Sequence, residues 1–302
     1  MVGYQAVNQS NSRPSVLILG GGFAGISCAS SLSSRHFNVC LVDQKSHFEF
    51  LPNIHEILSG VKRPRDVRLD LAQQMSALQH RFVKASAEGI APEKTQVILN
   101  NGTTLNYDYL VVGLGAIDAS YGVEGIEPNA FSFKSAEQCA AIYHQLNELR
   151  VASKPSRVTI IGAGITGVEA LGEIFRNEQF SHLKITILEA QSRLLPKNSP
   201  ELDRYIRDLC KPYPVDFRCH EAAQRIRKKS VLLRSDESLA SDLTIWTGGP
   251  APSPLLSAAG LAEPAVWAPV DDYLCSTRVD DVFIAGDSAD VPSTPAKQAY
   301  HA

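Results

Sequence analysis

Two glycine-rich segments of this chain have the spacing that brings backbone N–H groups to a phosphate. The first is Gly20-Gly21-Gly22-Phe23-Ala24-Gly25, after the apolar run 16–19, and the second is Gly162-Ala163-Gly164-Ile165-Thr166-Gly167, after 158–161. Each lies where a β-branched strand gives way to a helical pattern, so a tight turn can place a helix N-terminus against a pyrophosphate. One such match could be a turn that binds nothing. Two in the same context predict that the chain binds two dinucleotides.

An acidic residue ends the next apolar strand after each glycine-rich segment. Asp43 follows 39–42, and Glu189 follows 185–188. A carboxylate at this position accepts hydrogen bonds from both hydroxyls of an adenosine ribose and repels a 2′-phosphate. We therefore expect FAD at the first site and NADH at the second. Arg193, close to Glu189, keeps NADPH open as a less favoured alternative.

The elements that must position these residues alternate strand and helix, which is typical of parallel sheets. The segment 16–43 predicts one right-handed βαβ unit, and a second begins at Arg157. Alternating residues in 82–110 and in 216–246 each predict a small antiparallel β-meander, the first with turns at 88–89 and 100–102. A helix is expected over 136–151.

The expected fold is α/β, with two Rossmann-like domains that bind FAD and NAD(P). Each domain has a parallel sheet and a small antiparallel β-meander, and the NAD domain is inserted in the FAD domain. The predicted boundaries are 1–14 for a flexible extension, 15–118 with 247–302 for the discontinuous FAD-binding domain, and 119–246 for the NAD(H)-binding domain.

Composition narrows the class of protein. The chain has 302 residues, of which 44% are hydrophobic and 20% charged, and a net charge of −3, so nothing draws it to nucleic acid. Its longest apolar runs are shorter than the ~18 residues of a spanning helix. The polar N-terminus lacks the pattern of a secretory signal, so a cytoplasmic location is expected. The basic residues 225–229 are interpreted as a solvated hairpin edge.

The cysteines argue against thiol and metal chemistry. The six cysteines include no C-x-x-C pair, and no cysteine or histidine grouping has the spacing of zinc ligands. Reduction of a disulfide needs one thiol to attack and another to resolve. We therefore expect no catalytic dithiol and no metal.

A third acidic residue follows a late strand. The run 282–285 leads into Gly286-Asp287, where a carboxylate could accept hydrogen bonds from the hydroxyls of a flavin ribityl chain. The alternative is an aspartate that caps the next helix. A helix that begins near Pro295 would point its N-terminus at the flavin ring and favour the anionic reduced flavin.

In this order, these segments resemble the two-dinucleotide-binding flavoproteins of the pyridine nucleotide-disulfide oxidoreductase superfamily. The resemblance covers nearly the whole chain from Ser15, and the branch that it resembles most contains the type II NADH dehydrogenases and the ferroptosis-suppressor and apoptosis-inducing-factor-like proteins. The matching segments are Phe50-Leu51-Pro52 through Ser59-Gly60, Ile245 to Gly249, and Ile284 to Asp287. The resemblance implies cofactor contacts by Gln44, Lys45, Pro52, Gly115, Gly248, Gly286, Asp287 and Gln298.

Glu169 matches a carboxylate that lies near the nicotinamide and the flavin in this family, which makes it the candidate catalytic residue. The alternative is a polar residue near a helix N-terminus that only interacts with the helix dipole.

Two departures from the family pattern limit the resemblance. No cysteine occurs in 45–60, where disulfide reductases carry their pair. The segment Pro295-Ala296-Lys297-Gln298 only partly matches the quinone-facing element, because lysine stands at its alanine position, and the sequence ends at Ala302, where the family continues with a region for quinone access and membrane attachment. The sequence is therefore expected to be a fragment or a short relative.

The function expected from these residues is an FAD-dependent oxidoreductase that takes hydride from NADH and passes electrons to a quinone or a similar small acceptor. Two alternatives stay open. One is a soluble NAD(P)H reductase of a small redox protein or of oxygen, and the other is a nucleotide-responsive redox binding protein, while a catalytically poor truncated flavoprotein is a further variant. A homodimer and peripheral contact with the inner membrane through a C-terminal region are also open.

Overall fold

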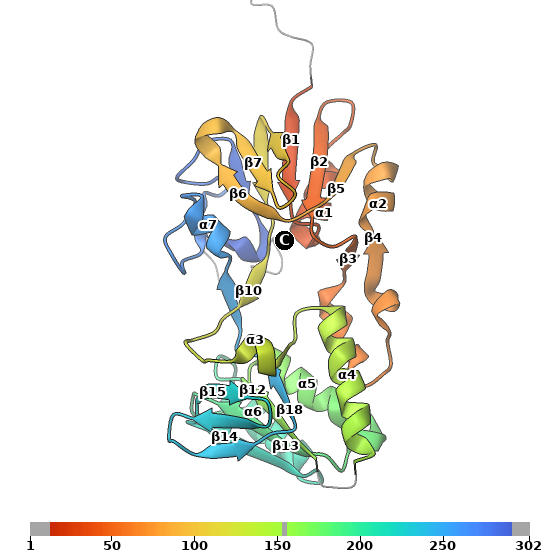
Figure 1. Ribbon diagram of the computed structural model, residues 1–302, viewed down its shortest axis with the longest axis vertical. Helices are drawn as coiled ribbons and strands as arrows, with labels where there is room; N and C mark the ends of the chain where they lie inside the picture. The colour runs from red at the N-terminus through yellow and green to blue at the C-terminus, as the bar shows by residue number, and fades with distance from the viewer. Residues whose placement is uncertain (1–12, 153–155, 292–302) are drawn as a thin grey trace, which may run out of the picture. The chain divides into compact units, whose positions relative to one another are not determined.

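The computed structural model describes residues 13–152 and 156–291. By its internal contacts the chain divides into two compact units (Figure 1). Unit 1 comprises 1–48, 69–116 and 252–302, and unit 2 comprises 49–68 and 117–251. Each unit is built around one parallel sheet of five strands.

The sheet of unit 1 has the strand order β21-β9-β1-β2-β5, and every neighbouring pair is parallel. The strands are β1 (Ser15–Leu19), β2 (Asn38–Asp43), β5 (Arg81–Lys84), β9 (Tyr109–Val112) and β21 (Val282–Ile284). Apart from the half-buried Val83 in β5, their β-branched and leucine side chains are buried on both faces, as in a covered parallel sheet.

Successive side chains of β1 point to opposite faces of this sheet and enter two different cores. Val16 and Ile18 pack with helices α1 (Phe23–Ser31) and α2 (Leu71–Ala77). Leu17 and Leu19 pack on the other face with α7 (Pro254–Ala258) and with the antiparallel sheet of β6 (Ala87–Ala91), β7 (Gln96–Leu99) and β8 (Thr104–Asn106).

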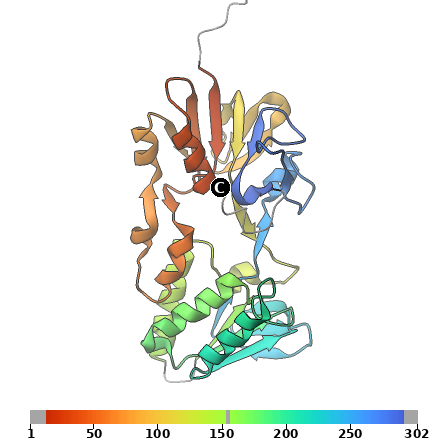
Figure 2. The same ribbon diagram turned by 180° about the vertical axis from the view of Figure 1, so that it is seen from behind.

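Unit 2 repeats this plan with the strand order β11-β18-β12-β13-β14, again parallel throughout. The strands are β11 (Phe131–Ser132), β12 (Arg157–Ile161), β13 (Lys184–Glu189), β14 (Val215–Cys219) and β18 (Leu243–Trp246). Val158 and Ile160 face a core shared with α4 (Ala136–Arg150) and α5 (Ile165–Arg176). Figure 2 shows α5 and α6 (Pro200–Cys210) in front of these strands.

The other face of this sheet packs against the second antiparallel sheet, formed by β15 (Ala223–Arg227), β16 (Ser230–Leu233) and β17 (Ser238–Ala240). The remaining elements are β3 (His47–Glu49), η1 (Leu51–Ile57), η2 (Pro64–Val67), β4 (Arg68–Asp70), η3 (Pro92–Lys94), β10 (Ala116–Asp118), α3 (Ile126–Asn129), η4 (Glu178–Phe180), β19 (Pro250–Pro252), β20 (Ala268–Pro269), η5 (Gly286–Ser288) and β22 (Ala289–Asp290).

The predicted α/β fold with two parallel sheets and two β-meanders is confirmed, but the extents of the meanders were wrong. Residues 81–84, 215–219 and 243–246 belong to the parallel sheets. Gly89, predicted in a turn, lies in β6 at an irregularity of the pairing with β7. The turn at 100–102 is present, since the Gly102 N–H donates to the Leu99 carbonyl at 2.9 Å. The basic residues 225–229 do form a hairpin edge between β15 and β16.

The segment 49–68, which the predicted boundaries assigned to the first domain, groups with unit 2 instead. The reason is its apolar side chains. Ile54, Ile57 and Leu58 are at most 5% exposed and pack in the same core as α4 and α5. Among the described residues, no helix has the length and apolar character needed to cross a bilayer.

Candidate dinucleotide-binding sites

The first glycine turn closes tightly between β1 and α1. Gly20 has a φ of +102°, and a Cβ there would lie 2.2 Å from the Gly113 carbonyl oxygen. A Cβ on Gly25 would lie 1.8 Å from the carbonyl oxygen of Gly20. Both positions therefore require glycine, one for its backbone conformation and the other for the close approach of helix and strand.

Gly22, in contrast, has open space around it. No heavy atom lies within 4 Å of where its Cβ would be, and it directly precedes the first residue of α1. The backbone is thus exposed at the helix N-terminus, the arrangement that accepts a phosphate. Phe23 begins the helix with its ring 5.0 Å from that of Phe48, and Ala24 is buried behind it.

Asp43 is joined to this turn by its carboxylate. One oxygen accepts from the Gly21 N–H at 2.6 Å, and the other accepts from the Lys45 N–H at 2.7 Å. Each carboxylate oxygen has a further lone pair, so the group can still accept from two ribose hydroxyls. Gln44 lies between Asp43 and Lys45 in the sequence, and its side-chain oxygen is 3.5 Å from the Ser86 hydroxyl.

The second glycine turn repeats this geometry. Gly162 has a φ of +106°, and a Cβ on Gly167 would lie 1.9 Å from the Gly162 carbonyl oxygen. Gly164 precedes α5 and has nothing within 4 Å of its Cβ position, whereas Thr166 in the first turn of α5 is half-buried. The Glu189 carboxylate, 8% exposed, accepts from the Ala163 N–H at 2.9 Å and from the Gln191 N–H at 2.9 Å.

Thr247 is a site residue that the sequence reasoning did not single out. Its hydroxyl lies 2.9 Å from the Ile161 carbonyl oxygen and 2.8 Å from that of Gly162, so it clamps the strand to the turn. Gly113 holds the equivalent place in unit 1, where its N–H donates to Leu19 as that of Thr247 donates to Ile161. Aligning the two strand ends, 109–115 and 243–249, would have revealed this position. Gly248 follows directly, against the ring of Trp246.

Arg193, close to Glu189 in the sequence, binds nearby backbone through its side chain. Its guanidinium donates to the carbonyl oxygens of Leu195, at 3.1 Å, and Pro196, at 2.8 Å.

The Gly286-Asp287 motif lies beside Gly115 in unit 1. The Ser288 hydroxyl, fully buried, donates to the Gly115 carbonyl at 3.1 Å and joins the two loops. Asp287 is exposed in the short η5 helix. Ser288 was not predicted, because a serine after a Gly-Asp pair carries no signal that identifies a partner 173 residues away.

Glu169 and Pro52 belong to unit 2, and Gln298 lies outside the described residues, as does the helix expected near Pro295. Glu169 is exposed on α5, two residues after Gly167. Partial shielding from water raises the pKa of its carboxyl group, the negative charge of Glu173 adds to this, and His55 opposes it. Pro52 is exposed in η1. The structure therefore does not bring Pro52 into one unit with the first glycine turn.

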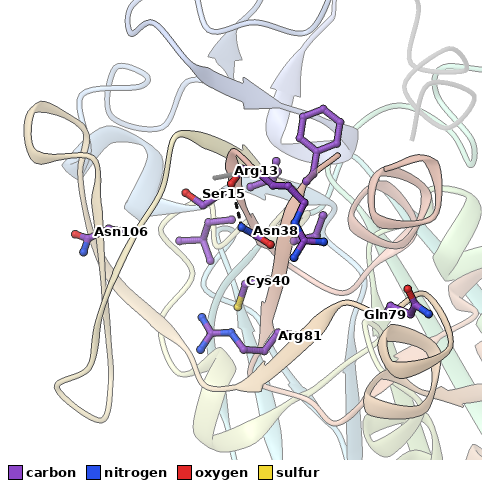
Figure 3. Close-up of a pocket in the computed structure, with 11 residues that line it drawn as sticks. Arg13, Ser15, Asn38, Cys40, Gln79, Arg81 and Asn106 are labelled. Carbon is purple, nitrogen blue, oxygen red and sulfur yellow. Dashed lines mark hydrogen bonds between the residues drawn. The ribbon is translucent and has the colours of Figure 1, made fainter. Parts of the chain in front are cut away.

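A polar cavity of about 320 Å³ lies at the end of the unit 1 sheet where β1, β2 and β5 begin, opposite the end that carries the glycine turn (Figure 3). Its polar groups bind one another or nearby backbone. Asn38 donates to the Arg13 carbonyl at 2.9 Å, Arg13 donates to that of Ser34, and the Gln79 oxygen accepts from the Ser34 hydroxyl at 3.0 Å. We interpret this cavity as structural.

The cysteines are buried or half-buried. All six are free thiols, and burial raises the pKa of Cys28, Cys40 and Cys139. A raised pKa disfavours the thiolate, which is the nucleophilic form.

Comparison with known proteins finds relatives that are similar to this chain in sequence. A probable NADH dehydrogenase of Dictyostelium discoideum is 25% identical over 305 residues, which cover 91% of this chain and 68% of the relative. A type II NADH:quinone oxidoreductase of Staphylococcus aureus is also 25% identical, over 94% of this chain and 77% of its own.

Solved structures share the fold. The structure of NDH2 from Plasmodium falciparum in complex with NADH superposes with a TM-score of 0.81 at 18% identity, covering 92% of this chain and 64% of the other. The sulfide:quinone oxidoreductase of Aquifex aeolicus gives 0.79 at 21% identity, covering 92% and 69%. The chain thus spans about two thirds of the length of these proteins.

The family model for pyridine nucleotide-disulphide oxidoreductases matches residues 14–302, which include both glycine turns, both acids and the Gly-Asp motif. This chain therefore belongs to the pyridine nucleotide-disulphide oxidoreductase family.

Proposed function

We propose that this protein is an FAD-dependent oxidoreductase that takes hydride from NADH and passes the electrons to a quinone or a similar small acceptor. The observation that carries the proposal is the duplicated cradle. Each unit has a glycine turn with one open glycine, Gly22 or Gly164, and one acid whose carboxylate binds the backbone of that turn, Asp43 or Glu189. An enzyme that moves electrons between two dinucleotides needs two such cradles.

We assign FAD to unit 1. Asp43 would accept from the adenosine ribose, and the open backbone at Gly22 would face the pyrophosphate. The Gly286-Asp287 loop in the same unit, joined to Gly115 by Ser288, supports FAD in particular. An exposed carboxylate there can accept from ribityl hydroxyls, which the second dinucleotide lacks.

We assign NADH to unit 2 and prefer it to NADPH. The Glu189 carboxylate would repel a 2′-phosphate, and Arg193, which could have offset that repulsion, donates to two backbone carbonyls instead. The relatives named for NADH dehydrogenase activity support the same choice.

When bound, the flavin supplies the two-electron chemistry, so the side chains of this chain bind, orient and shield. The two glycine turns hold the pyrophosphates, and the two acids fix the adenosine ends. Glu169 is the proposed catalytic residue. Its raised pKa keeps a proton available nearer to neutral pH than an ordinary glutamate would.

The proposed acceptor is a quinone, because the Staphylococcus aureus relative is a type II NADH:quinone oxidoreductase. A solved structure of the same fold is a complex of putidaredoxin reductase with putidaredoxin, at 23% identity, so the fold alone is compatible with a protein acceptor. We place the enzyme in the cytoplasm, where NADH is supplied.

Steady-state oxidation of NADH tests the acceptor. We expect turnover with a water-soluble ubiquinone or menaquinone analogue to exceed that with a small ferredoxin, an artificial dye or oxygen. The Gly164→Ala variant is the control, since it should lose turnover with every acceptor. If the ferredoxin is reduced fast and no quinone is reduced, the quinone assignment would be contradicted, but the assignment of the NADH site would stand.

A further inference from the structure

Thr247 directly follows β18 and lies against the second glycine turn, within unit 2. Its hydroxyl oxygen is 2.8 Å from the Gly162 carbonyl oxygen and 2.9 Å from that of Ile161. The Ile161 oxygen also accepts from the Thr247 N–H at 2.9 Å, so the hydroxyl hydrogen can serve the Gly162 oxygen. Thr247 is 9% exposed, and a Cβ on Gly167 would lie 3.0 Å from its hydroxyl oxygen. The hydroxyl is therefore enclosed between the turn and the start of α5.

The peptide unit between Gly162 and Ala163 is bound at both of its polar ends. Its carbonyl oxygen accepts from the Thr247 hydroxyl, and its N–H donates to the Glu189 carboxylate at 2.9 Å. A trans peptide unit is planar, so its C=O and N–H point in opposite directions and turn together. The contact that holds the oxygen therefore also fixes the direction of the N–H that binds Glu189. The second Glu189 oxygen accepts from the Gln191 N–H at 2.9 Å.

This restraint acts on a part of the backbone that has few restraints of its own. Gly162 has a φ of +106°, and Gly164 has open space around it. Glycine has more accessible backbone conformations than any other residue, so ordering a glycine turn costs more entropy. The Thr247 hydroxyl offsets this freedom from the neighbouring strand, because β18 pairs in parallel with β12, which leads into the turn.

The first glycine turn offers a comparison within the same chain. A Cβ on Gly20 would lie 2.2 Å from the Gly113 carbonyl oxygen, just as one on Gly162 would lie 2.4 Å from that of Thr247. Gly113 thus holds the equivalent place in unit 1, but glycine has no side chain and supplies no hydroxyl there. The difference agrees with the proposed function. NADH leaves in every turnover, so its turn must keep its shape while empty, whereas a resident FAD supports its own turn.

We propose that Thr247 is a positioning residue for NADH, which holds the Gly162–Ala163 peptide, and through it the Glu189 carboxylate, in the orientation that binds the adenosine ribose. The proposal deepens the proposed function and rests on NADH binding to unit 2. A site that is ordered before the ligand arrives loses less entropy on binding, so loss of the hydroxyl should weaken binding and leave hydride transfer unchanged.

The test is Thr247→Ala, measured in the flavin-loaded protein by isothermal titration calorimetry with tetrahydro-NADH, a non-reducing analogue. We expect the Kd to rise on the order of fivefold, as for the loss of one hydrogen bond. In steady-state turnover the KM for NADH should rise with it, while kcat stays within about twofold of the wild type. Hydrogen–deuterium exchange of the amides of 162–164 should be faster in Thr247→Ala before any nucleotide is added.

Two further variants separate the hydroxyl contact from packing and from stability. Thr247→Ser keeps the hydroxyl and should restore the wild-type Kd. Thr244→Ala is the matched control, because Thr244 lies on β18, is 4% exposed, and has its hydroxyl 3.0 Å from that of Ser241. This control also loses a buried hydroxyl, so it should lower the Tm without changing the Kd.

A double-mutant cycle tests the route through Glu189. If Thr247 acts through this carboxylate, Thr247→Ala should change the Kd little in the Glu189→Ala background. An equal fold-change in both backgrounds would overturn that route.

A wild-type Kd in Thr247→Ala would overturn the inference while leaving NADH binding intact. A Thr247→Ser variant that binds as weakly as Thr247→Ala would also overturn it, because the loss would then come from the missing methyl group. An equally weakened Thr244→Ala would overturn it too, since lost stability would explain the effect. No saturable binding of tetrahydro-NADH by the wild type would instead contradict the proposed function.

Discussion

The glycines of each turn divide into two classes with different physical roles. Gly25 and Gly167 are closed in by the carbonyl oxygens of Gly20 and Gly162, less than 2 Å from any added Cβ. Gly22 and Gly164 face open space. The first class is needed for folding, because helix and strand cannot otherwise approach, and we propose that the second is needed for the ligand, because the backbone must reach a phosphate.

This division predicts opposite phenotypes in unit 2. Gly167→Ala forces a clash that costs about 1–3 kcal/mol or more, so thermal denaturation should show a lower Tm even without nucleotide. In Gly164→Ala the added Cβ has no protein atom within 4 Å, so this variant should keep the wild-type Tm. Its affinity for NADH should fall roughly 10-fold or more, the cost of losing hydrogen bonds to a charged group. A Gly164→Ala variant that unfolds but binds normally when cooled would invert the assignment.

The acid of the second cradle should control nucleotide choice. Glu189→Ala removes the proposed ribose acceptor and the repulsion of a 2′-phosphate, so we expect NADH affinity to fall roughly 10-fold and NADPH affinity to rise toward it. Fluorescence titration with both nucleotides measures the ratio. Glu178→Ala, at an exposed position of the η4 helix, is the control and should leave the ratio unchanged. An unaltered preference in Glu189→Ala would rule out this carboxylate as the determinant.

The residues of these sites that recur at fixed spacing could be predicted from the sequence, whereas those that bind a partner far along the chain could not. Asp43 and Glu189 follow their glycine turns by one strand, so spacing predicted them, and both lie where their carboxylates bind the turn backbone. The hydroxyls of Thr247 and Ser288 donate to the carbonyl oxygens of Gly162 and Gly115, which lie 85 and 173 residues away in the sequence. No local pattern encodes such a partner, which only the tertiary fold supplies.

At the scale of elements, the sequence predicted where strands occur better than it predicted which strands they pair with. Alternating residues at 215–219 and 243–246 were assigned to a meander, although both strands pair in parallel with the sheet of unit 2. A short apolar run has the same appearance in either kind of sheet, because periodicity reports which faces are buried and not which strand is the neighbour. The segment 49–68 groups with unit 2, and not with the predicted first domain, for a related reason. Its helix-like pattern predicts a buried face but not the core that buries it.

This segment should contribute to the stability of unit 2. Leu58 is fully buried in the core of α4 and α5, so Leu58→Ala should lower the free energy of unfolding by about 2–5 kcal/mol. Val61, 53% exposed, is the matched control, and Val61→Ala should change it by less than about 0.5 kcal/mol. Urea denaturation followed by circular dichroism measures both. Equal small effects would mean that the segment does not pack on unit 2 in solution.

At the scale of the whole molecule, the chain carries one plan twice. Both sheets place the glycine-turn strand in the centre, the acid-bearing strand beside it, and the strand that directly precedes Gly113 or Thr247 on its other side. Both have helices on one face and an antiparallel sheet of three strands on the other. The two sheets differ in one edge strand. In unit 1 this strand, β21, follows the central strand in the sequence, whereas in unit 2 the corresponding strand, β11, precedes it. The sequence predicted this duplication because both glycine motifs are complete.

Two independent cradles predict two separate footprints in hydrogen–deuterium exchange. FAD should protect 20–25 and 43–45, and a non-reducing NADH analogue added to the flavin-loaded protein should protect 162–167 and 189–191. Each binding event stabilises the unit that holds the ligand by mass action. Protection of both turns by the NADH analogue alone, with flavin absent, would show that the assignment of one nucleotide to each unit is wrong.

The central claim is that NADH held by unit 2 transfers hydride to a flavin held by unit 1. Anaerobic stopped-flow mixing of the flavin-loaded protein with NADH tests it most directly. We predict rapid bleaching of the visible flavin absorbance by NADH, slower bleaching by NADPH, and strongly retarded bleaching by NADH in Gly164→Ala. A protein that binds flavin but keeps its oxidised spectrum with either nucleotide would contradict the account.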